Sequence, residues 1–157
     1  MQEAFLYFSG WRSKVILQMS TPIKYDNELL KLISFFESIT KARLHDCFVD
    51  QNGTLVFVVE PAQYGLAVGK SGANVRSIEA AVKKRVKIVE HSDDIVAFVA
   101  GLIQPSKARE IAFTDGAVII TPEPSSRSFL IGRAGKNAKN FESIVKRYFP
   151  VKELKVL

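Results

Sequence analysis

Side chains that form disulfides or bind metals are scarce in this chain of 157 residues. Its single cysteine, Cys47, excludes an internal disulfide and any zinc site that needs two thiolates. With only His45 and His91 as further nitrogen ligands, a protein metal site is not expected, and we expect no cofactor. This composition fits a reducing, cytoplasmic setting.

Long apolar runs are also missing. The apolar stretch 5–17 is interrupted by serine, glycine, arginine and lysine, whereas a membrane span needs about 20 apolar residues. The stretch also lacks a preceding basic region and a following small-residue cleavage site, so we expect no export signal and no membrane partner. The hydrophobic share of 47% is enough for a real core.

Positive charge is concentrated in two blocks of the sequence. The formal net charge is +6. Residues 69–87 contain six basic side chains and one acidic one, and residues 127–155 contain eight and two. Such a patch is typical of a surface that meets nucleic acid, an anionic membrane or only solvent, and charge alone does not decide between them.

The two basic blocks are copies of each other at an offset of 63 residues. Between residues 53–83 and 116–146, nine of 31 positions are identical without an insertion. They include a turn glycine, a Glu-Pro pair, both glycines of a GxxG sequence and an asparagine shortly after it. Chance explains one shared GxxG but not all these features in one register, so we expect a duplicated domain.

Each copy predicts the order helix, strand, strand, helix, helix, strand. The dipeptides Asn52-Gly53 and Asp115-Gly116 are typical of tight hairpin turns, and Asp26 is expected to cap the first helix. The expected elements of the first copy are a helix at 26–40, strands at 44–50 and 54–60, helices at 63–68 and 73–85, and a strand at 86–90. Those of the second are a helix at 92–103, strands at 107–113 and 117–121, helices at 126–131 and 136–148, and a strand at 151–156.

The fold class is therefore α+β, with one domain at 26–91 and a second at 92–157. Because almost no linker separates them, we expect the two to pack as one rigid unit. Residues 1–25 are expected to be an N-terminal extension. For residues 1–18 we favour a flexible segment, or a wrongly assigned one upstream of a true start at Met19. The alternative is an arm in which Phe8, Trp11, Arg12 and Lys14 contact RNA or a partner.

A helix–GxxG–helix segment occurs in both copies, as Gly69-Lys70-Ser71-Gly72 and as Gly132-Arg133-Ala134-Gly135. Glycine lets the backbone turn tightly and approach a ligand closely, and the next helix presents free N–H groups and a positive dipole end. A loop of this kind clamps about four nucleotides in a KH module. A single GxxG would be better explained as a helix–helix turn, but two in register favour binding of single-stranded RNA.

Catalytic motifs are not convincing. The segment 65–71 approaches the P-loop pattern GxxxxGK[ST], but three residues separate its glycines where four are needed. Residues 45–47 are histidine, aspartate and cysteine, but neighbours on a strand point to opposite faces, and Cys47 is interpreted as a small buried side chain. We therefore expect no enzyme and no small-molecule substrate.

Two glutamates recur in the helices after the loops. Glu79 and Glu142 lie among basic residues, and we interpret them as i,i+4 partners of Lys83 and Lys146. No catalytic role is needed to explain them.

Several segments of the two copies resemble the archaeal NusA-like family of transcription factors. The resemblance rests on segments 46–59, 65–75, 88–94 and 132–137, and it covers roughly residue 26 to the C-terminus. It implies two type II KH domains fused into one RNA-binding surface, with a role in transcription termination, antitermination or elongation control. Bacterial relatives also carry polymerase-binding and S1 domains, for which this chain has no room, so polymerase contact cannot simply be carried over.

The expected partners are single-stranded RNA as nascent transcript and, less directly, RNA polymerase or other transcription factors. A structural KH-type component of a ribonucleoprotein, such as a ribosome or exosome subunit, is the alternative, and a nucleotide-binding enzyme is a more distant one. The expected RNA-binding residues are those of the two loops and the helix turns beside them: Val68, Gly69, Lys70, Ser71, Gly72, Asn74, Arg76, Ile131, Gly132, Arg133, Ala134, Gly135, Lys136, Asn137 and Lys139.

Overall fold

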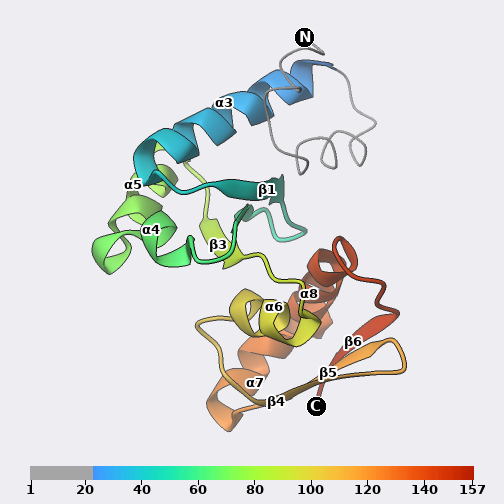
Figure 1. Cartoon of the computed structure of the whole chain (residues 1–157). Helices are drawn as coiled ribbons and strands as arrows, with labels where there is room; N and C mark the ends of the chain where they lie inside the picture. Colours follow the sequence, from blue (N-terminus) through green and yellow to red (C-terminus); the bar gives the residue numbers. More distant parts are fainter. Residues whose placement is uncertain (1–22) are drawn as a thin grey trace. The chain divides into compact units, whose positions relative to one another are not determined.

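The computed structural model describes residues 23–157 of the chain (Figure 1). Predictions made for residues 1–22, including the aromatic and basic arm, lie outside the described residues. The described residues divide into two compact units, residues 23–48 with 54–91 and residues 49–53 with 92–157. Each unit is built around one three-stranded sheet.

The first unit has a sheet of strand order β1-β2-β3 with helices packed on it. Strand β2 pairs in parallel with β3, and Phe57 lies opposite Ile88. In chain order the elements are α3 (Ile23–Thr40), β1 (Leu44–Val49), β2 (Leu55–Val59), α4 (Tyr64–Val68), the 3-10 turn η1 (Lys70–Gly72), α5 (Ala73–Val82) and β3 (Val86–Glu90).

The core of the first unit lies between its sheet and its helices. Every residue of β2 is buried, as its run of five apolar side chains predicts. Phe57 stacks on Phe36 of α3 with ring centroids 4.3 Å apart, and Ile78 of α5 is buried in the same cluster. This packing holds α3, α4 and α5 at fixed positions on the sheet, and so holds the loop between α4 and α5.

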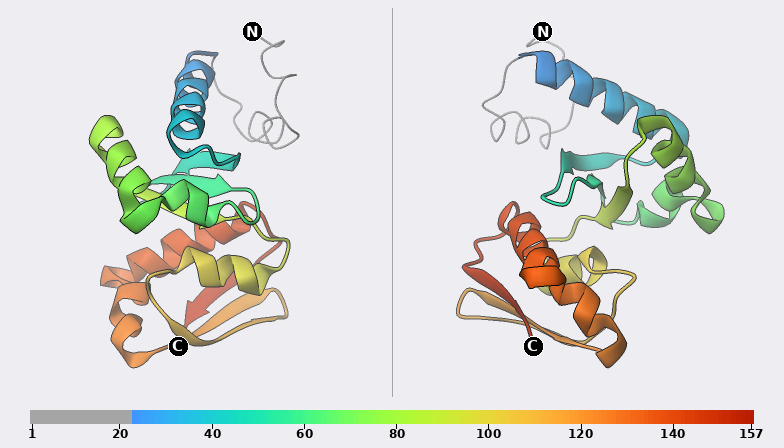
Figure 2. Two further views of the ribbon diagram at one scale, coloured as in Figure 1. Left: turned by 60° about the vertical axis from the view of Figure 1, so that its left-hand side comes forward. Right: turned by 180° about the vertical axis from the view of Figure 1, so that it is seen from behind.

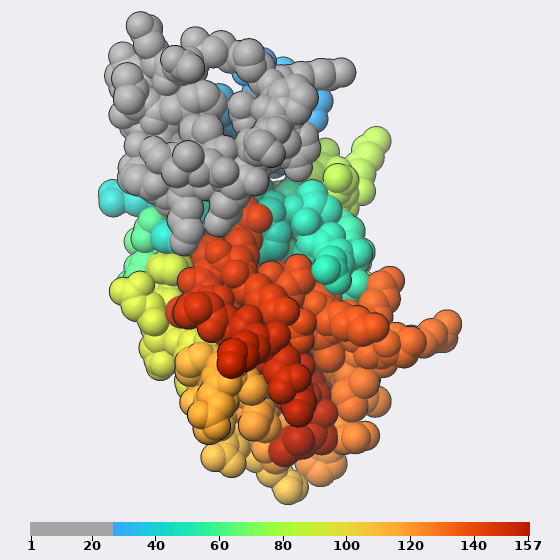
Figure 3. All heavy atoms as spheres, turned by 90° about the vertical axis from the view of Figure 1, so that its right-hand side faces the viewer, coloured from blue at the N-terminus to red at the C-terminus, as the bar shows by residue number. Residues whose placement is uncertain are grey.

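The second unit repeats this plan, with strand order β4-β5-β6. Its elements are α6 (Ile95–Leu102), β4 (Ala108–Thr114), β5 (Ala117–Pro122), α7 (Pro124–Ile131), the 3-10 turn η2 (Arg133–Gly135), α8 (Lys136–Lys146) and β6 (Glu153–Val156). Strand β5 is antiparallel to β4 and parallel to β6. The helices α6, α7 and α8 lie on one face of the sheet (Figure 2), and β6 lies at the surface (Figure 3).

Burial in β5 alternates, in contrast to β2. Val118 and Ile120 are fully buried towards the helices, whereas Ala117 and Ile119 are only half-buried. Such alternation is typical of a sheet with one face on the core. Helix α6 begins where the Asp94 side chain accepts hydrogen bonds from the amides of Val96 and Ala97, which is an ordinary N-cap.

The predicted order of elements is confirmed in both copies, but several bounds are wrong. Helix α6 begins at Ile95 rather than at 92, α7 at Pro124 rather than at 126, and β6 at Glu153 rather than at 151. Helix α3 begins at Ile23, so Asp26 lies inside it rather than at its cap. Helix α5 ends at Val82 because Lys83 takes a left-handed conformation, with φ of 55°, that a helix cannot continue. Helix α8 ends at Lys146, two residues before the expected end. Packing of the two units as one rigid body stays a prediction.

Candidate nucleic-acid interface

The two glycine loops have the same backbone conformation although their inner residues differ. The φ/ψ angles of Gly69 are 76°/173°, and those of Gly132 are 74°/173°. The inner residues Ser71 and Ala134 are both left-handed, with φ of 52° and 55°. Since the sequences GKSG and GRAG give one geometry, the fold around each loop dictates its shape rather than the inner side chains.

Only glycine fits the first position of each loop. Its φ/ψ region is almost closed to residues with a Cβ atom. A Cβ atom added to Gly69 would come within 2.8 Å of the Asn74 side chain, and one added to Gly132 would come within 2.8 Å of Asn137. The backbone therefore passes directly over an asparagine of the following helix.

That asparagine ties the two helices of each copy together. The Asn74 side-chain amide donates a 3.1 Å hydrogen bond to the carbonyl of Leu66 in α4. The Asn137 amide donates a 2.6 Å bond to the carbonyl of Phe129 in α7. Both residues belong to the predicted RNA-binding set, and the structure places their donor groups on the protein itself. These bonds hold each loop in position, and contact of the two asparagines with RNA stays a prediction.

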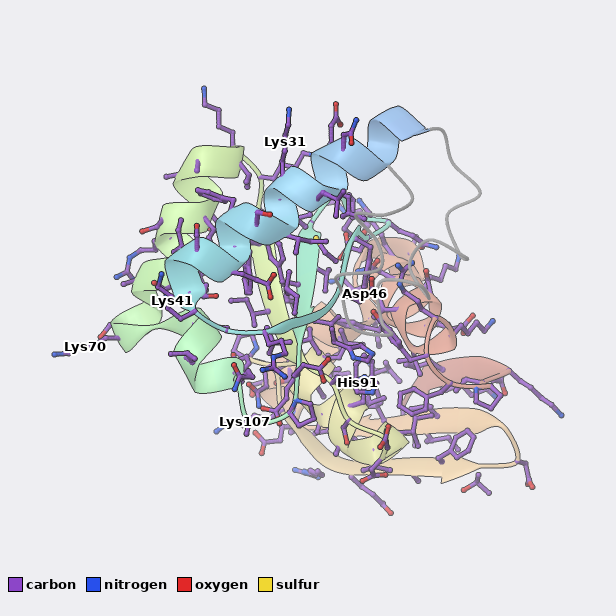
Figure 4. All side chains as sticks on the ribbon, turned by 45° about the horizontal axis from the view of Figure 1, so that its top comes forward. Lys31, Lys41, Asp46, Lys70, His91 and Lys107 are labelled. Carbon is purple, nitrogen blue, oxygen red and sulfur yellow. The ribbon has the colours of Figure 1, made fainter. Side chains whose placement is uncertain are left out.

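Lys70 and Arg133 occupy the outer tips of the loops and are exposed. Lys70 projects away from the first unit at the turn between α4 and α5 (Figure 4). The helices that follow begin Ala73-Asn74-Val75 and Lys136-Asn137-Ala138, so their first turns carry neutral or basic side chains only. Free N–H groups and a positive helix end next to a cation form a good site for a phosphate.

The remaining predicted site residues surround the loops. Arg76 is exposed and donates a hydrogen bond through Nη1 to the Ser71 carbonyl, so it also braces the first loop. Lys136 and Lys139 are exposed on α8. Val68 and Ile131 end the helices before the loops and are half-buried, as are Gly72 and Gly135.

The second loop has additional support from residues 49–53, which belong to the second unit. Asn52 donates through Nδ2 to Asn137 Oδ1 over 3.1 Å. One turn further along α8, the buried Asn140 accepts from the Gln51 amide at 3.1 Å and donates to Asp50 Oδ2 at 3.0 Å. The Asn137 side chain thus accepts from Asn52 through Oδ1 and donates to the Phe129 carbonyl through Nδ2, which fixes its orientation.

The recurring glutamates join each loop helix to the final strand. Glu142 accepts from the Leu154 amide at 2.9 Å and from Lys146 Nζ at 3.0 Å, so its predicted i,i+4 pair is confirmed. Partial burial raises the pKa of the Glu142 carboxyl, but the Leu154 amide and Lys146 outweigh it and hold the pKa below its ordinary value. Glu79 instead accepts from the Val86 amide at 3.0 Å. In the described part of the chain it makes no ion pair with Lys83, so that predicted pair is wrong.

The histidines and the cysteine lie apart from the loops. His45 and His91 stack with ring centroids 3.7 Å apart, and His45 Nδ1 lies 3.3 Å from Glu60 Oε1. Cys47 is free and buried, which confirms its interpretation as a small core side chain. Within residues 23–157, no group of three histidine, cysteine, aspartate or glutamate side chains is placed to hold a metal.

The sequence did not predict three features of the structure. The exposed apolar side chains of Leu66 and Phe129 occupy equivalent places three residues before each loop, a match that the offset of 63 could have shown. The support of Asn137 by Asn52 is a long-range contact without a sequence signal. The sequence shows that residues 83–85 are basic, but not that all three are exposed just after the end of α5.

Comparisons with known proteins agree with this geometry. A sequence profile of the KH domain matches residues 32–104. The chain is 31% identical to the probable transcription termination protein NusA of Methanococcus vannielii over 86% of this chain and 80% of the relative. It is 29% identical to the protein of the same name from Methanocaldococcus jannaschii, over 86% of this chain and 75% of the relative.

The fold has a counterpart among solved structures. The crystal structure of APE1850 matches with a TM-score of 0.65 and 28% sequence identity, covering 82% of this chain and 96% of the other. Among the described residues of this chain, every helix is too short or too polar to cross a membrane.

Proposed function

The chain belongs to the archaeal family of NusA-like KH-domain proteins, and from that premise we propose that it binds single-stranded RNA through both glycine loops and acts in transcription termination. The observation that supports this most strongly is the matched pair of loops, each with a cation at its tip and a helix N-terminus behind it. Chance does not explain why both the tip cation and the helix N-terminus recur in the second copy in the same register and with the same backbone angles.

Each loop holds phosphates, and the rest of each KH domain holds bases. The amides at the start of α5 and α8 and the charges of Lys70 and Arg133 bind the strand backbone. Val68 and Ile131, half-buried beside the loops, offer apolar surface to unstacked bases. Asn74, Asn137 and Arg76 act through the loop geometry described above. Domains 26–91 and 92–157 each supply one such site, and two linked sites raise the affinity for a longer strand.

The proposed setting is the nascent transcript in the cytoplasm, with RNA polymerase or other transcription factors as partners and without a catalytic step of its own. The relatives named probable transcription termination proteins support this setting.

The test compares RNA forms by fluorescence anisotropy. The protein is titrated into a labelled ~12-nucleotide single strand and into the same strand annealed as a duplex, at two salt concentrations. We expect preference for the single strand and affinity that falls steeply with salt. Equal affinity for the duplex would contradict the proposal, because it would indicate only a basic surface.

A transcription assay separates this function from that of a structural ribonucleoprotein component. Added to an archaeal polymerase on a template with a terminator, the protein is expected to change the ratio of terminated to full-length transcript. An unchanged ratio, together with stable association with ribosomal or exosomal particles, would favour the structural component.

A further inference from the structure

A second basic feature lies at the opposite end of helix α5 from the first glycine loop. Lys83, Lys84 and Arg85 follow directly after the last residue of the helix, and all three are exposed. We call these three residues the basic corner. Within residues 23–157, their charged head groups make no ion pair and no hydrogen bond.

In the second copy the lysine at the end of the loop helix forms an ion pair, whereas its counterpart in the first copy, Lys83, does not within the described residues. Lys146, the counterpart of Lys83, is held by Glu142 at 3.0 Å. In the first copy the Glu79 carboxylate accepts from the Val86 amide, as Glu142 does from the Leu154 amide, but within residues 23–157 it makes no ion pair with Lys83. Among these residues the shared position therefore carries a paired cation, Lys146, in the second copy and an unpaired one, Lys83, in the first, and Lys84 and Arg85 add two further unpaired cations to the first copy.

Helix stability alone does not explain the basic corner. A cation in the last turn of a helix gains a small stabilisation from the helix dipole, and the effect falls off within one turn. That accounts for one lysine at the end of α5. It does not account for Arg85, which lies beyond the left-handed Lys83 where the chain leaves the helix.

The basic corner and the first loop lie at the two ends of one rigid helix, α5. Helix α5 has 10 residues and is about 15 Å long. Between Lys70 and Lys87 the sequence contains one acidic residue, Glu79, which is half-buried on the Val86 amide. Arg76 is exposed between the two ends. A polyanion that leaves the loop along this helix meets positive charge at both ends and exposed negative charge at neither.

We propose that the basic corner binds phosphates of the same single-stranded RNA, beyond the nucleotides that the first loop clamps. This inference rests on the proposed function of the loops. A flexible polyanion fits the corner better than a folded protein surface does, because two of its three residues are lysines, which are depleted in the cores of protein interfaces, whereas the aromatic side chains that are enriched there are missing from residues 83–85. The large exposed apolar side chains of the described residues lie elsewhere, at Val49, Tyr64, Leu66, Phe113, Phe129 and Leu157.

The test removes the charges of the basic corner and compares RNA lengths. The variant K83Q/K84Q/R85Q is titrated with a ~12-nucleotide and a ~5-nucleotide single-stranded RNA at several salt concentrations. The matched control is R109Q/K152Q/K155Q, which removes two lysines and one arginine that are exposed on and beside the β4-β5-β6 sheet. The loop variant K70D/S71D is titrated alongside. Thermal unfolding followed by circular dichroism shows whether each variant is folded.

We expect the corner variant to bind the long RNA about tenfold more weakly and the short RNA within about twofold of the wild type. The slope of log affinity against log salt on the long RNA is expected to fall by about 2, for three lost contacts on a single strand. The sheet control is expected to behave as wild type, and the loop variant to weaken both RNAs.

Three results would overturn the inference. If the corner variant binds the long RNA as the sheet control does, the corner faces solvent or an acidic partner instead. If the affinity of the corner variant falls equally for both RNA lengths, its charges act on the loop and not on a further part of the strand. If the wild type shows no salt-sensitive RNA binding, the proposed function fails and the inference fails with it, whereas in the first two cases the proposed function stands.

Discussion

The side-chain amide of Asn137 donates a 2.6 Å hydrogen bond to the main-chain carbonyl of Phe129, across the second glycine loop. The carbonyls of the last helical turn have no partner within the helix, so this bond satisfies one of them. It also fixes the distance between the end of α7 and the start of α8. Asn74 and Leu66 repeat the arrangement at the first loop, with a bond of 3.1 Å.

The first prediction concerns this asparagine. Asn137→Ala removes two side-chain hydrogen bonds, one to the Phe129 carbonyl and one from Asn52, each worth about 1 kcal/mol, and leaves the second loop less well defined. We expect RNA affinity to fall about fivefold, which is the equivalent of one of these bonds. The salt slope should stay unchanged, since the side chain contacts no phosphate. Anisotropy titrations at several salt concentrations measure both quantities.

Asn52→Ala is the control for the Asn137 variant. It removes only the bond to Asn137 Oδ1 and leaves the bond to Phe129 in place, so we expect a smaller loss of affinity. A drop in the salt slope of about 0.7 in the Asn137 variant, the value for one lost phosphate contact, would show that Asn137 touches the RNA directly.

The second prediction concerns the first glycine of the loop. Gly132→Ala puts a Cβ atom 2.8 Å from the Asn137 side chain, at a φ of 74° that alanine rarely adopts. We expect a loss of about 1–3 kcal/mol in the free energy of unfolding, measured by urea denaturation, and a loss of RNA affinity at the second site.

Gly65→Ala is the matched glycine control. Gly65 lies inside helix α4, and a Cβ atom there would meet nothing within 4 Å. Alanine is the better helix former, so this variant should be more stable by about 0.5–1 kcal/mol. Equal destabilisation by both substitutions would contradict the strain assigned to the loop.

The third prediction concerns pH. The pKa of Glu142 is lowered in the folded state by the Leu154 amide and Lys146 against the opposing effect of burial. A lowered pKa means that the carboxylate stabilises the fold above its unfolded pKa of about 4.3, and that this stabilisation is lost as pH falls through the folded value. Glu142→Gln should therefore unfold more easily than wild type at pH 7, by a margin that shrinks as the pH falls below about 4. A margin that stays constant in urea melts across this range would contradict the assignment.

The fourth prediction concerns the start of α6. The Asp94 side chain accepts from the amides of Val96 and Ala97 at 3.2 and 3.4 Å. Asp94→Ala should lower the free energy of unfolding by about 1 kcal/mol, the usual cost of losing an N-cap. Asp94→Ser keeps an acceptor and should recover most of that loss. If serine and alanine are equally destabilising, the cap is not what holds this helix end.

Local sequence signals predicted most of the fold. The hairpin turns, the strand order along the chain and the position of each GxxG between two helices all depend on residues within a few positions of one another. The duplication then gave each of these signals a second, independent example. Helix ends were less well predicted, because the left-handed Lys83 that stops α5 is not a glycine and carries no sequence mark.

Long-range contacts at the site could not be predicted. The partner of Glu79 is the Val86 amide, which becomes available only when β3 pairs with β2 and its start is held near α5. The bond from Asn52 to Asn137 joins residues 85 positions apart. The sequence shows that Asn74 and Asn137 follow shortly after each GxxG, but it could not show that their side-chain amides donate hydrogen bonds within the protein.

The most direct test of the central claim is RNA binding by the loop variants K70D/S71D and R133D/A134D and by their combination. Each is titrated by fluorescence anisotropy against the same ~12-nucleotide single-stranded RNA. Both pairs replace exposed tip residues, so the variants should keep the wild-type circular dichroism spectrum. We expect each double variant to bind more weakly than wild type and the combined variant to lose salt-sensitive binding. Wild-type affinity in the folded combined variant would contradict the central claim.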